Sequence, residues 1–250
     1  MKFQFTPESI QILKNFSNIN KSIVIKPDHF YSRATSDALV GIYRHETPLN
    51  FTGAFGIYEL NNFLSVIGAF KNPEIEVHDK YVNIMEGNMK TRYGTTPIDL
   101  CSYYQKVKGE TVDPFDQGNQ RYRVEKNFES ATIELDFVLP AEKLSMMNKM
   151  ASLLSAKHIY FETVHLESDS NFIRMTIGGE DLSNSDYTWE LAIDSEIQKN
   201  CLPKIVRMNV DELCLIQDDF RVQISSQGIT KWNSVNVNLS YIIGCSALKK

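Results

Sequence analysis

Residues that could perform catalysis are scattered along this sequence and match no common catalytic spacing. None of the patterns GxxxxGKS, GxxxxGKT, GxGxxG, HExxH or GxSxG occurs. The histidines stand apart without the spacing of metal ligands, at His29, His45, His78, His158 and His165. We expect each to be a surface or packing residue. Because active sites also assemble from distant residues, this absence removes a reason to propose an enzyme without excluding one.

Carboxylates and thiols also lack a pattern that indicates chemistry. The acid pairs Glu180-Asp181 and Asp218-Asp219 stand beside turns or strand edges, where such residues commonly form turns. The cysteines are far apart and form no CxxC, at Cys101, Cys201, Cys214 and Cys245. We expect free thiols in or near a core, and no disulfide, metal or cofactor site.

The composition is typical of a globular protein that stays in the cytosol. No apolar run approaches the roughly 18 residues of a membrane span. The first residues have no signal-peptide pattern, because Glu8 and Lys14 interrupt the apolar positions. The net charge of −5 argues against a protein that grips nucleic acid over its whole surface, but it allows a small basic face.

Four segments have the pattern of helices. The first begins at Thr6, with Pro7 at its first position, and runs to about Asn18. The second runs from about Glu59 to Phe70, the third begins at Pro140, and a short fourth covers 209–216. Strand-like segments rich in Val, Ile, Phe, Tyr and Thr lie between them. A helix followed by about three strands therefore occurs four times, without visible sequence repetition.

The helix faces opposite the expected core carry small polar side chains and few charges. At 100° per residue, the apolar sides are Ile12, Leu13, Phe16 and Ile19; Leu60, Phe63, Leu64, Ile67 and Phe70; and Leu144, Met147, Ala151 and Leu154. The opposite sides are Gln11, Lys14, Asn15 and Asn18; Asn61, Asn62, Ser65 and Ala69; and Ser145, Asn148, Lys149 and Ser152. Such faces suit a surface that passes close to a polyanion, although a plain solvated face explains them too.

The third helix carries an additional apolar stripe on its side, formed by Met146, Met150 and Leu153. This stripe fits extra core packing. It also fits a surface that receives a neighbouring subunit.

A polar stretch within 104–128 separates two pairs of helix-and-strand units. It holds Gly109, Pro114 and Gly118 and has the composition of a connector. We predict an N-terminal domain at 1–110, an interdomain connector at 111–128 and a C-terminal domain at 129–250.

Parts of the sequence resemble the sliding clamps of T-even bacteriophages. The resemblance lies in Leu13-Lys14-Asn15-Phe16-Ser17 with Ile19-Asn20, then in Ile23–Lys26 with Phe30 and Thr35, and again in Tyr58–Leu64. The C-terminal half is similar mainly in pattern, through Ile133-Glu134, the helix from Pro140 and the strands after Phe220.

The resemblance implies an α+β protein with the DNA clamp fold, which is also the architecture of the bacterial beta clamp and of proliferating cell nuclear antigen. Each of two similar domains then consists of two βαβββ units, with helices lining a ring and sheets outside. Three chains form the ring, and four helices per chain supply twelve lining helices. The ring encircles duplex DNA and tethers the replicative polymerase, with no catalytic activity of its own.

The resemblance also suggests which residues meet DNA and partners. Lysines on the lining helices attract phosphates without sequence preference; the candidates are Lys14, Lys149 and Lys157, then Lys143 and Lys71. The acids Asp211 and Glu212 of the fourth helix depart from a uniformly basic lining, although a helix dipole explains them and Lys204 and Arg207 just upstream offset them. A partner pocket is expected at Phe115 and Tyr122 of the connector and at Tyr241 and Ile243 of the last strand. Phe115 fits equally well as a residue that pins the connector to the domain beneath it.

The expected partners are duplex DNA, the phage polymerase, an ATP-dependent clamp loader, late transcription factors and two further copies of the chain, in the cytoplasm of an infected bacterium. A processivity factor of the same fold that does not close into a ring remains an alternative. A β-rich structural or binding protein of a virion is the second alternative, and an enzyme of unknown type is the third.

Overall fold

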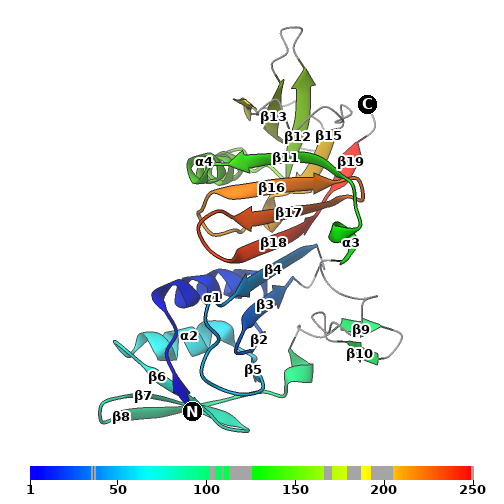
Figure 1. Ribbon diagram of the computed structural model, residues 1–250. Helices are drawn as coiled ribbons and strands as arrows, with labels where there is room; N and C mark the ends of the chain where they lie inside the picture. The colour runs from blue at the N-terminus through cyan, green and yellow to red at the C-terminus, as the bar shows by residue number, and fades with distance from the viewer. Residues whose placement is uncertain are drawn as a thin grey trace. The chain divides into compact units, whose positions relative to one another are not determined.

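The computed structural model describes residues 1–34, 36, 38–101, 105–107, 110–112, 126–165, 171–178, 187–192 and 205–248. The chain divides into two compact units, Met1–Lys126 and Asn127–Lys250 (Figure 1). Among the described residues, each unit contains two larger groups of antiparallel strands with helices packed on them, and the first unit has a further two-stranded sheet.

The first unit contains two βαβββ runs. The first run is β1 (Lys2–Phe3), α1 (Pro7–Ile19), β2 (Ile23–Ile25), β3 (His29–Arg33) and β4 (Leu39–Arg44). The second is β5 (Phe55–Ile57), α2 (Leu60–Gly68), β6 (Glu74–Val77), β7 (Tyr81–Glu86) and β8 (Met89–Gly94). The turn η1 (Ile98–Leu100), β9 (Gln105–Val107) and β10 (Glu110–Val112) follow.

The two runs of the first unit exchange their first strands. Strand β1 pairs with β6 of the second run, giving the order β1-β6-β7-β8. Strand β5 pairs with β2 of the first run, giving the order β4-β3-β2-β5. Neither run forms a complete sheet without the other, so the unit folds as one body.

The second unit repeats this plan. Its elements are α3 (Lys126–Glu129), β11 (Ile133–Leu139), α4 (Ala141–Leu153), β12 (His158–His165), β13 (Asn171–Gly178), β14 (Tyr187–Ala192), β15 (Ile205–Asn209), η3 (Val210–Glu212), β16 (Phe220–Ser225), β17 (Ile229–Ser234), β18 (Leu239–Gly244) and β19 (Ser246–Leu248). The strand orders are β11-β16-β17-β18 and β14-β13-β12-β15-β19. These are the orders of the first unit, with β19 added beside β15, so the α+β class and the twofold strand pattern are confirmed.

Helix α1 forms for the reasons that its sequence indicates. The Thr6 side chain accepts a hydrogen bond from the backbone N–H of Ser9 at 3.0 Å, and Pro7 occupies the first turn. The helix buries the face that carries Phe16 against β4. A Cβ added to Gly41 of β4 would lie only 2.6 Å from the Phe16 ring. Glycine at this position therefore lets the helix sit close to the sheet.

The predicted fourth helix is wrong. The segment between β15 and β16 is a single 3₁₀ turn, Val210–Glu212, followed by an irregular stretch. Leu213 and Leu215 are both buried, at 2% and 8% exposure, so the apolar side chains alternate as in an extended chain rather than following a helical period. The hydroxyl of Tyr241 accepts a hydrogen bond from the backbone N–H of Ile216, which holds this stretch against β18. The expectation of four lining helices per chain therefore fails at this position.

Candidate nucleic-acid interface

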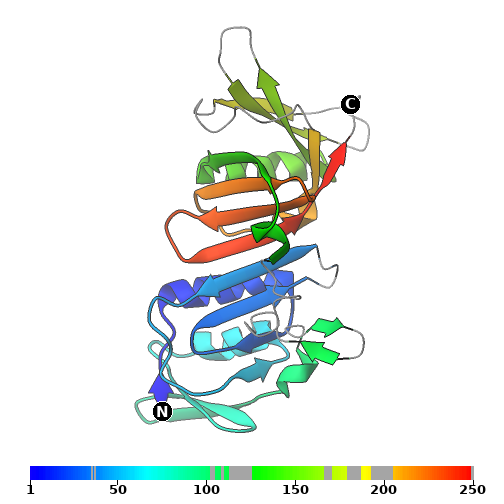
Figure 2. The same cartoon turned by 45° about the vertical axis from the view of Figure 1, so that its right-hand side comes forward.

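Helices α1 and α2 lie side by side on one face of the first unit (Figure 2). Their apolar sides are buried as predicted, except that Phe70, just after α2, is half-buried. The predicted polar side chains of α2 are exposed, at Asn61, Asn62, Ser65 and Ala69. On α1 the side chains of Gln11, Lys14 and Asn18 are exposed. The result is a helix surface with short polar groups and an isolated positive charge.

The structure brings together two of the lysines that the sequence suggested for DNA. Lys14 of α1 and Lys71, just after α2, line the same hollow of about 400 Å³, whose walls include Ile10, Ile67 and Phe70. Both lysine side chains are exposed. The turn that carries Lys71 is fixed by Glu86, whose carboxylate accepts the backbone N–H groups of Lys71 at 3.0 Å and Asn72 at 2.7 Å.

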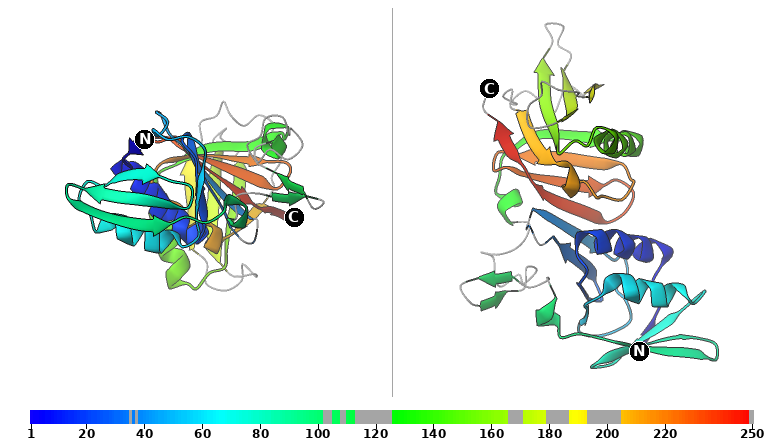
Figure 3. Two further views of the ribbon diagram at one scale, coloured as in Figure 1. Left: turned by 90° about the horizontal axis from the view of Figure 1, so that it is seen from below. Right: turned by 180° about the vertical axis from the view of Figure 1, so that it is seen from behind.

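Helix α4 is the corresponding element of the second unit (Figure 3). Its N-terminus has no cap from its own first residues; instead, Asp219 accepts a hydrogen bond from the backbone N–H of Ala141 at 2.7 Å. Lys149 on α4 and Lys157 just beyond it are exposed, and Lys143 is half-buried. Lys143 and Lys149 lie in α4, and Lys157 lies four residues after its end, as the sequence suggested.

The lysines of this set are uncompensated within the described part of the chain. No ion pair there involves Lys14, Lys71, Lys143, Lys149 or Lys157. Each therefore offers its full positive charge to a polyanion, while the short neighbouring side chains allow a close approach.

The apolar stripe on α4 is exposed in the single chain. Met146 is 44% exposed, Leu153 is 68% exposed and Met150 is half-buried. The hydroxyl of Tyr187 on β14 donates to the Met146 sulfur at 3.2 Å, so the stripe adjoins β14, the edge strand of its sheet. Among the described strands β14 lies at an edge of its sheet, and an edge strand beside exposed apolar side chains is a surface suited to association.

The predicted partner pocket needs correction. Tyr241 and Ile243 are both 0% exposed, and the Tyr241 ring packs edge-on against Phe220 with centroids 5.9 Å apart. They belong to the core of the second unit, where a peptide cannot reach them. The other two pocket residues, Phe115 and Tyr122, lie outside the described residues.

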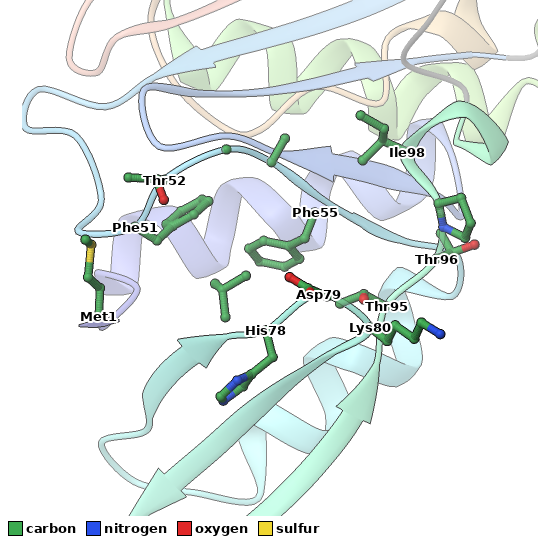
Figure 4. Close-up of a pocket in the computed structure, with 14 residues that line it drawn as sticks. Met1, Phe51, Thr52, Phe55, His78, Asp79, Lys80, Thr95, Thr96 and Ile98 are labelled. Carbon is green, nitrogen blue, oxygen red and sulfur yellow. The ribbon is translucent and has the colours of Figure 1, made fainter.

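A hollow that the sequence did not suggest opens in the first unit (Figure 4). It has a volume of about 800 Å³ and lies between the residues that lead into β5, the β6–β7 turn and the end of β8. Its floor includes the buried rings of Phe51 and Phe55, and its rim includes His78, Asp79 and Lys80. The lining residues are Met1 and three separate segments, 51–55, 77–80 and 95–98, which local sequence patterns do not bring together.

The remaining titratable groups have structural roles. Burial raises the pKa of the Cys101 thiol to about 11 and that of the Cys245 thiol to about 12, so both stay protonated and unreactive at neutral pH. Burial lowers the pKa of His45 to about 4, and its ring packs edge-on against Phe30 with centroids 4.4 Å apart. Asp218 accepts hydrogen bonds from the side chains of Ser234 and Asn236.

The described residues contain no cluster of three or more His, Cys, Asp or Glu side chains that could hold a metal ion. No helix in the described part of the chain is both long and apolar enough to span a membrane.

Comparison with known proteins identifies relatives of this architecture. No protein-family model matches the chain. The chain is 28% identical over 251 aligned residues to a sliding clamp of Vibrio phage KVP40, an alignment that covers 96% of this chain and 97% of that protein. The resemblance to phage sliding clamps is therefore confirmed along the whole chain rather than in its first part alone.

Solved structures show the same fold at low sequence identity. Proliferating cell nuclear antigen of Entamoeba histolytica superposes with a TM-score of 0.65 and 11% identity, covering 98% of this chain and 97% of the other. The proliferating cell nuclear antigen of A. fulgidus, bound to the C-terminal region of FEN-1, superposes with a TM-score of 0.66 and 10% identity. The match covers 100% of this chain and 99% of the other. The beta subunit of the Streptococcus pyogenes DNA polymerase superposes with a TM-score of 0.60 and 12% identity. The match covers 100% of this chain and 66% of the beta subunit. The chain therefore has the DNA clamp fold.

Proposed function

We propose that this protein is a sliding clamp, which encircles duplex DNA as a ring of three chains and tethers a replicative DNA polymerase. The observation that carries the proposal is the strand order that both units share. The helices packed on these strands, α1, α2 and α4, expose short polar side chains, with isolated lysines on or beside them. The full-length similarity to a phage sliding clamp supports it.

Encirclement explains why the helix surfaces need only a few charges. A ring stays on DNA because it is closed, so its contacts need not supply the affinity. Lysines that meet phosphates attract DNA without reading its sequence. Short neutral side chains between the lysines keep the duplex close without binding it firmly, so the ring remains free to slide.

The exposed edge strands suggest how the ring closes. We place β14 with Met146 and Leu153 of one chain against β8 of the next chain. Strand β8 is an edge strand with Lys90 and Arg92 exposed, whereas β14 exposes Glu190. Both edges are six residues long, a match that suits antiparallel pairing between copies. Contacts of this head-to-tail kind form a ring when the rotation between subunits closes.

The clamp proposal includes partners and a place of action. A neighbour of the same fold binds the C-terminal region of FEN-1. We propose that this chain likewise receives protein tails, the polymerase among them, with residues 111–128 as the connector between its domains. An ATP-dependent loader opens the ring, late transcription factors use it, and the protein acts without catalysis in the cytoplasm of an infected bacterium.

Two measurements test the proposal together. Light scattering after size-exclusion chromatography should give about three times the chain mass of 28.6 kDa. Protein loaded on nicked circular DNA should stay bound in high salt and dissociate when a restriction enzyme linearises the circle. A processivity factor that does not close would give a smaller mass and the same release from circular and linear DNA, which would refute the ring.

A further inference from the structure

Three polar side chains meet on the face of β6 and β7 opposite the buried Ile75 and Ile84. Glu76 on β6 pairs directly with Asn83 on β7, and His78 follows Glu76 by two residues, so all three lie on one face. His78 Nε2 lies 3.1 Å from Glu76 Oε2, and Asn83 Nδ2 lies 2.9 Å from each of these atoms. The three atoms therefore form a closed triangle with nearly equal sides.

Hydrogen bonds cannot satisfy all three sides of this triangle while Glu76 is ionised. If the His78 ring is neutral with its proton on Nδ1, the Nε2 lone pair accepts from Asn83 but faces the Glu76 carboxylate. If Nε2 carries a proton, it donates to Glu76, but the donors of His78 and Asn83 then face each other. If the Asn83 amide is turned over, its oxygen faces the carboxylate. Each arrangement leaves one repulsive contact.

The carboxylate of this triangle is ionised at neutral pH. Hydrogen bonds from Asn83 and His78, and then the charge of Lys90 on β8, hold the pKa of the Glu76 carboxyl below its usual range. The repulsion within the triangle is therefore present under ordinary conditions, and adding a proton to Glu76 does not relieve it.

A divalent cation inside the triangle would remove the conflict. Glu76 Oε2, a neutral His78 Nε2 and the Asn83 oxygen of a turned amide would all direct lone pairs at it. Ligands that bind an ion at about 2.1 Å and at right angles lie about 3.0 Å from one another, which matches the observed sides. Among the described residues the Asn83 oxygen is buried without a hydrogen-bond partner, so its present orientation is not fixed from both ends.

Neighbouring residues hold the ligands in place. The His78 ring (Figure 4) stacks on Tyr81 with centroids 4.6 Å apart, and the Arg92 guanidinium lies 4.1 Å from the centre of the same Tyr81 ring. The backbone N–H of His78 donates to the carbonyl of Tyr81 at 2.9 Å, which closes the β6–β7 turn. Asn83 is only 3% exposed. The three ligands are thus positioned before an ion arrives.

We propose that Glu76, His78 and Asn83 bind a divalent transition-metal ion such as Zn²⁺. An imidazole nitrogen beside oxygen ligands favours such ions over Mg²⁺ and Ca²⁺, which prefer oxygen alone. The side chains of His78 and Glu76 are 36% and 29% exposed, so water completes the coordination. Because Lys90 repels a cation and only one ligand is charged, the ion exchanges with solution. The site joins β6 to β7 and does not depend on the proposed clamp function.

Titration of Zn²⁺ into the chelator-treated full-length protein tests the site by calorimetry. Wild type should show a saturable site that Glu76→Gln and His78→Gln each weaken by more than about 100-fold, the upper end of the loss caused by removing a residue that merely supports a ligand. The matched control Glu74→Gln removes a carboxylate two residues away on the same strand, where it pairs with Lys2. It should bind Zn²⁺ like wild type.

The variant Asn83→Asp provides a gain of binding instead of a loss. Without metal, its added carboxylate lies against Glu76 and should lower the melting temperature. Zn²⁺ should then raise the melting temperature by more than in wild type, because charged ligands increase cation affinity and a bound ion stabilises the folded chain.

Two results would overturn the site. One is Zn²⁺ binding that is absent in wild type or equal in Glu76→Gln, His78→Gln and the control. The other is an Asn83→Asp variant whose melting temperature Zn²⁺ raises no more than that of wild type. Neither result bears on the clamp proposal, which is tested by the oligomer mass and by release from linearised DNA.

Discussion

Replacing Lys14 and Lys149 with glutamine removes one unpaired, exposed positive charge from a helix of each unit. Glutamine keeps a long polar side chain with good helix propensity, so the helices should remain intact. Within the described residues neither lysine forms an ion pair, so folding should be little affected.

The expected effect follows from counterion release. Each lysine that neutralises a phosphate contributes about 0.9 to the slope of log affinity against log salt. At 0.15 M salt this corresponds to about fivefold in affinity for one lysine, or roughly 30-fold when both meet phosphates in the same complex. Charge reversal to glutamate should weaken binding further, because it adds repulsion.

The assay has two parts. Anisotropy titration of linear duplexes from about 0.05 to 0.2 M salt, a range in which such affinities change steeply, gives the slope. Primer extension on a loaded template gives the processivity of the polymerase. Size-exclusion chromatography should show an unchanged oligomer. An unchanged slope and unchanged processivity, with the oligomer intact, would show that these helix faces do not meet DNA.

Four further results are expected. Met146→Glu should lower the mass measured by light scattering while Val235→Glu, on an exposed loop, should not; a full-size oligomer in both would show that the α4 stripe is not an interface. Asp219→Ala should reduce the free energy of unfolding in urea by about 1–2 kcal/mol through loss of the α4 cap, and Asp219→Asn should recover most of it. Because His45 takes up a proton near pH 6.5 when unfolded but only near pH 4 when folded, stability should fall by about 2 kcal/mol as pH drops through that window, after allowance for its partial exposure, and His45→Phe should remove this dependence. Phe115→Ala should weaken binding of a polymerase C-terminal peptide at an unchanged melting temperature; a lower melting temperature with normal affinity would place Phe115 in the fold instead.

Local sequence signals predicted the three long helices, α1, α2 and α4, correctly. Thr6 and Pro7 determine where α1 begins. The apolar periodicity of α1, α2 and α4 matches the residues that the structure buries, except for Phe70 and Leu154, which are half-buried at the helix ends. Such signals depend on residues within one or two turns, so a single sequence carries them. The pairing of β1 with β6 and of β5 with β2 has no local signal, because the partners are far apart in the chain.

The two errors arise from the same ambiguity of short apolar segments. The segment with Leu213 and Leu215 is compatible with a helix or an extended chain, and hydrogen bonding to Tyr241 favours the extended form. Tyr241 and Ile243 read equally well as a strand facing a partner or a strand facing the core. In the structure both faces of β18 are buried, and Tyr241 packs against Phe220 of a neighbouring segment that local sequence cannot identify.

Lys21 and Lys157 illustrate a different limit of sequence reasoning. The carbonyl of Lys21 accepts the backbone N–H of Leu60, and the carbonyl of Lys157 accepts that of Val210. The two positions are therefore equivalent in the two units, although the sequences around them differ. Such an equivalence becomes visible only when the units are compared through their backbone hydrogen bonds.

The overall acidity of the chain and a role on DNA are compatible for an electrostatic reason. At physiological salt the Debye length is about 8 Å, so exposed charges on the far side of the molecule act only weakly on a duplex. The net charge of −5 is therefore largely screened from a duplex that faces the helices, and only local lysines and acids count there. A clamp can therefore remain acidic outside while a handful of helix-side charges, such as Lys14 and Lys149, sets how strongly it holds DNA.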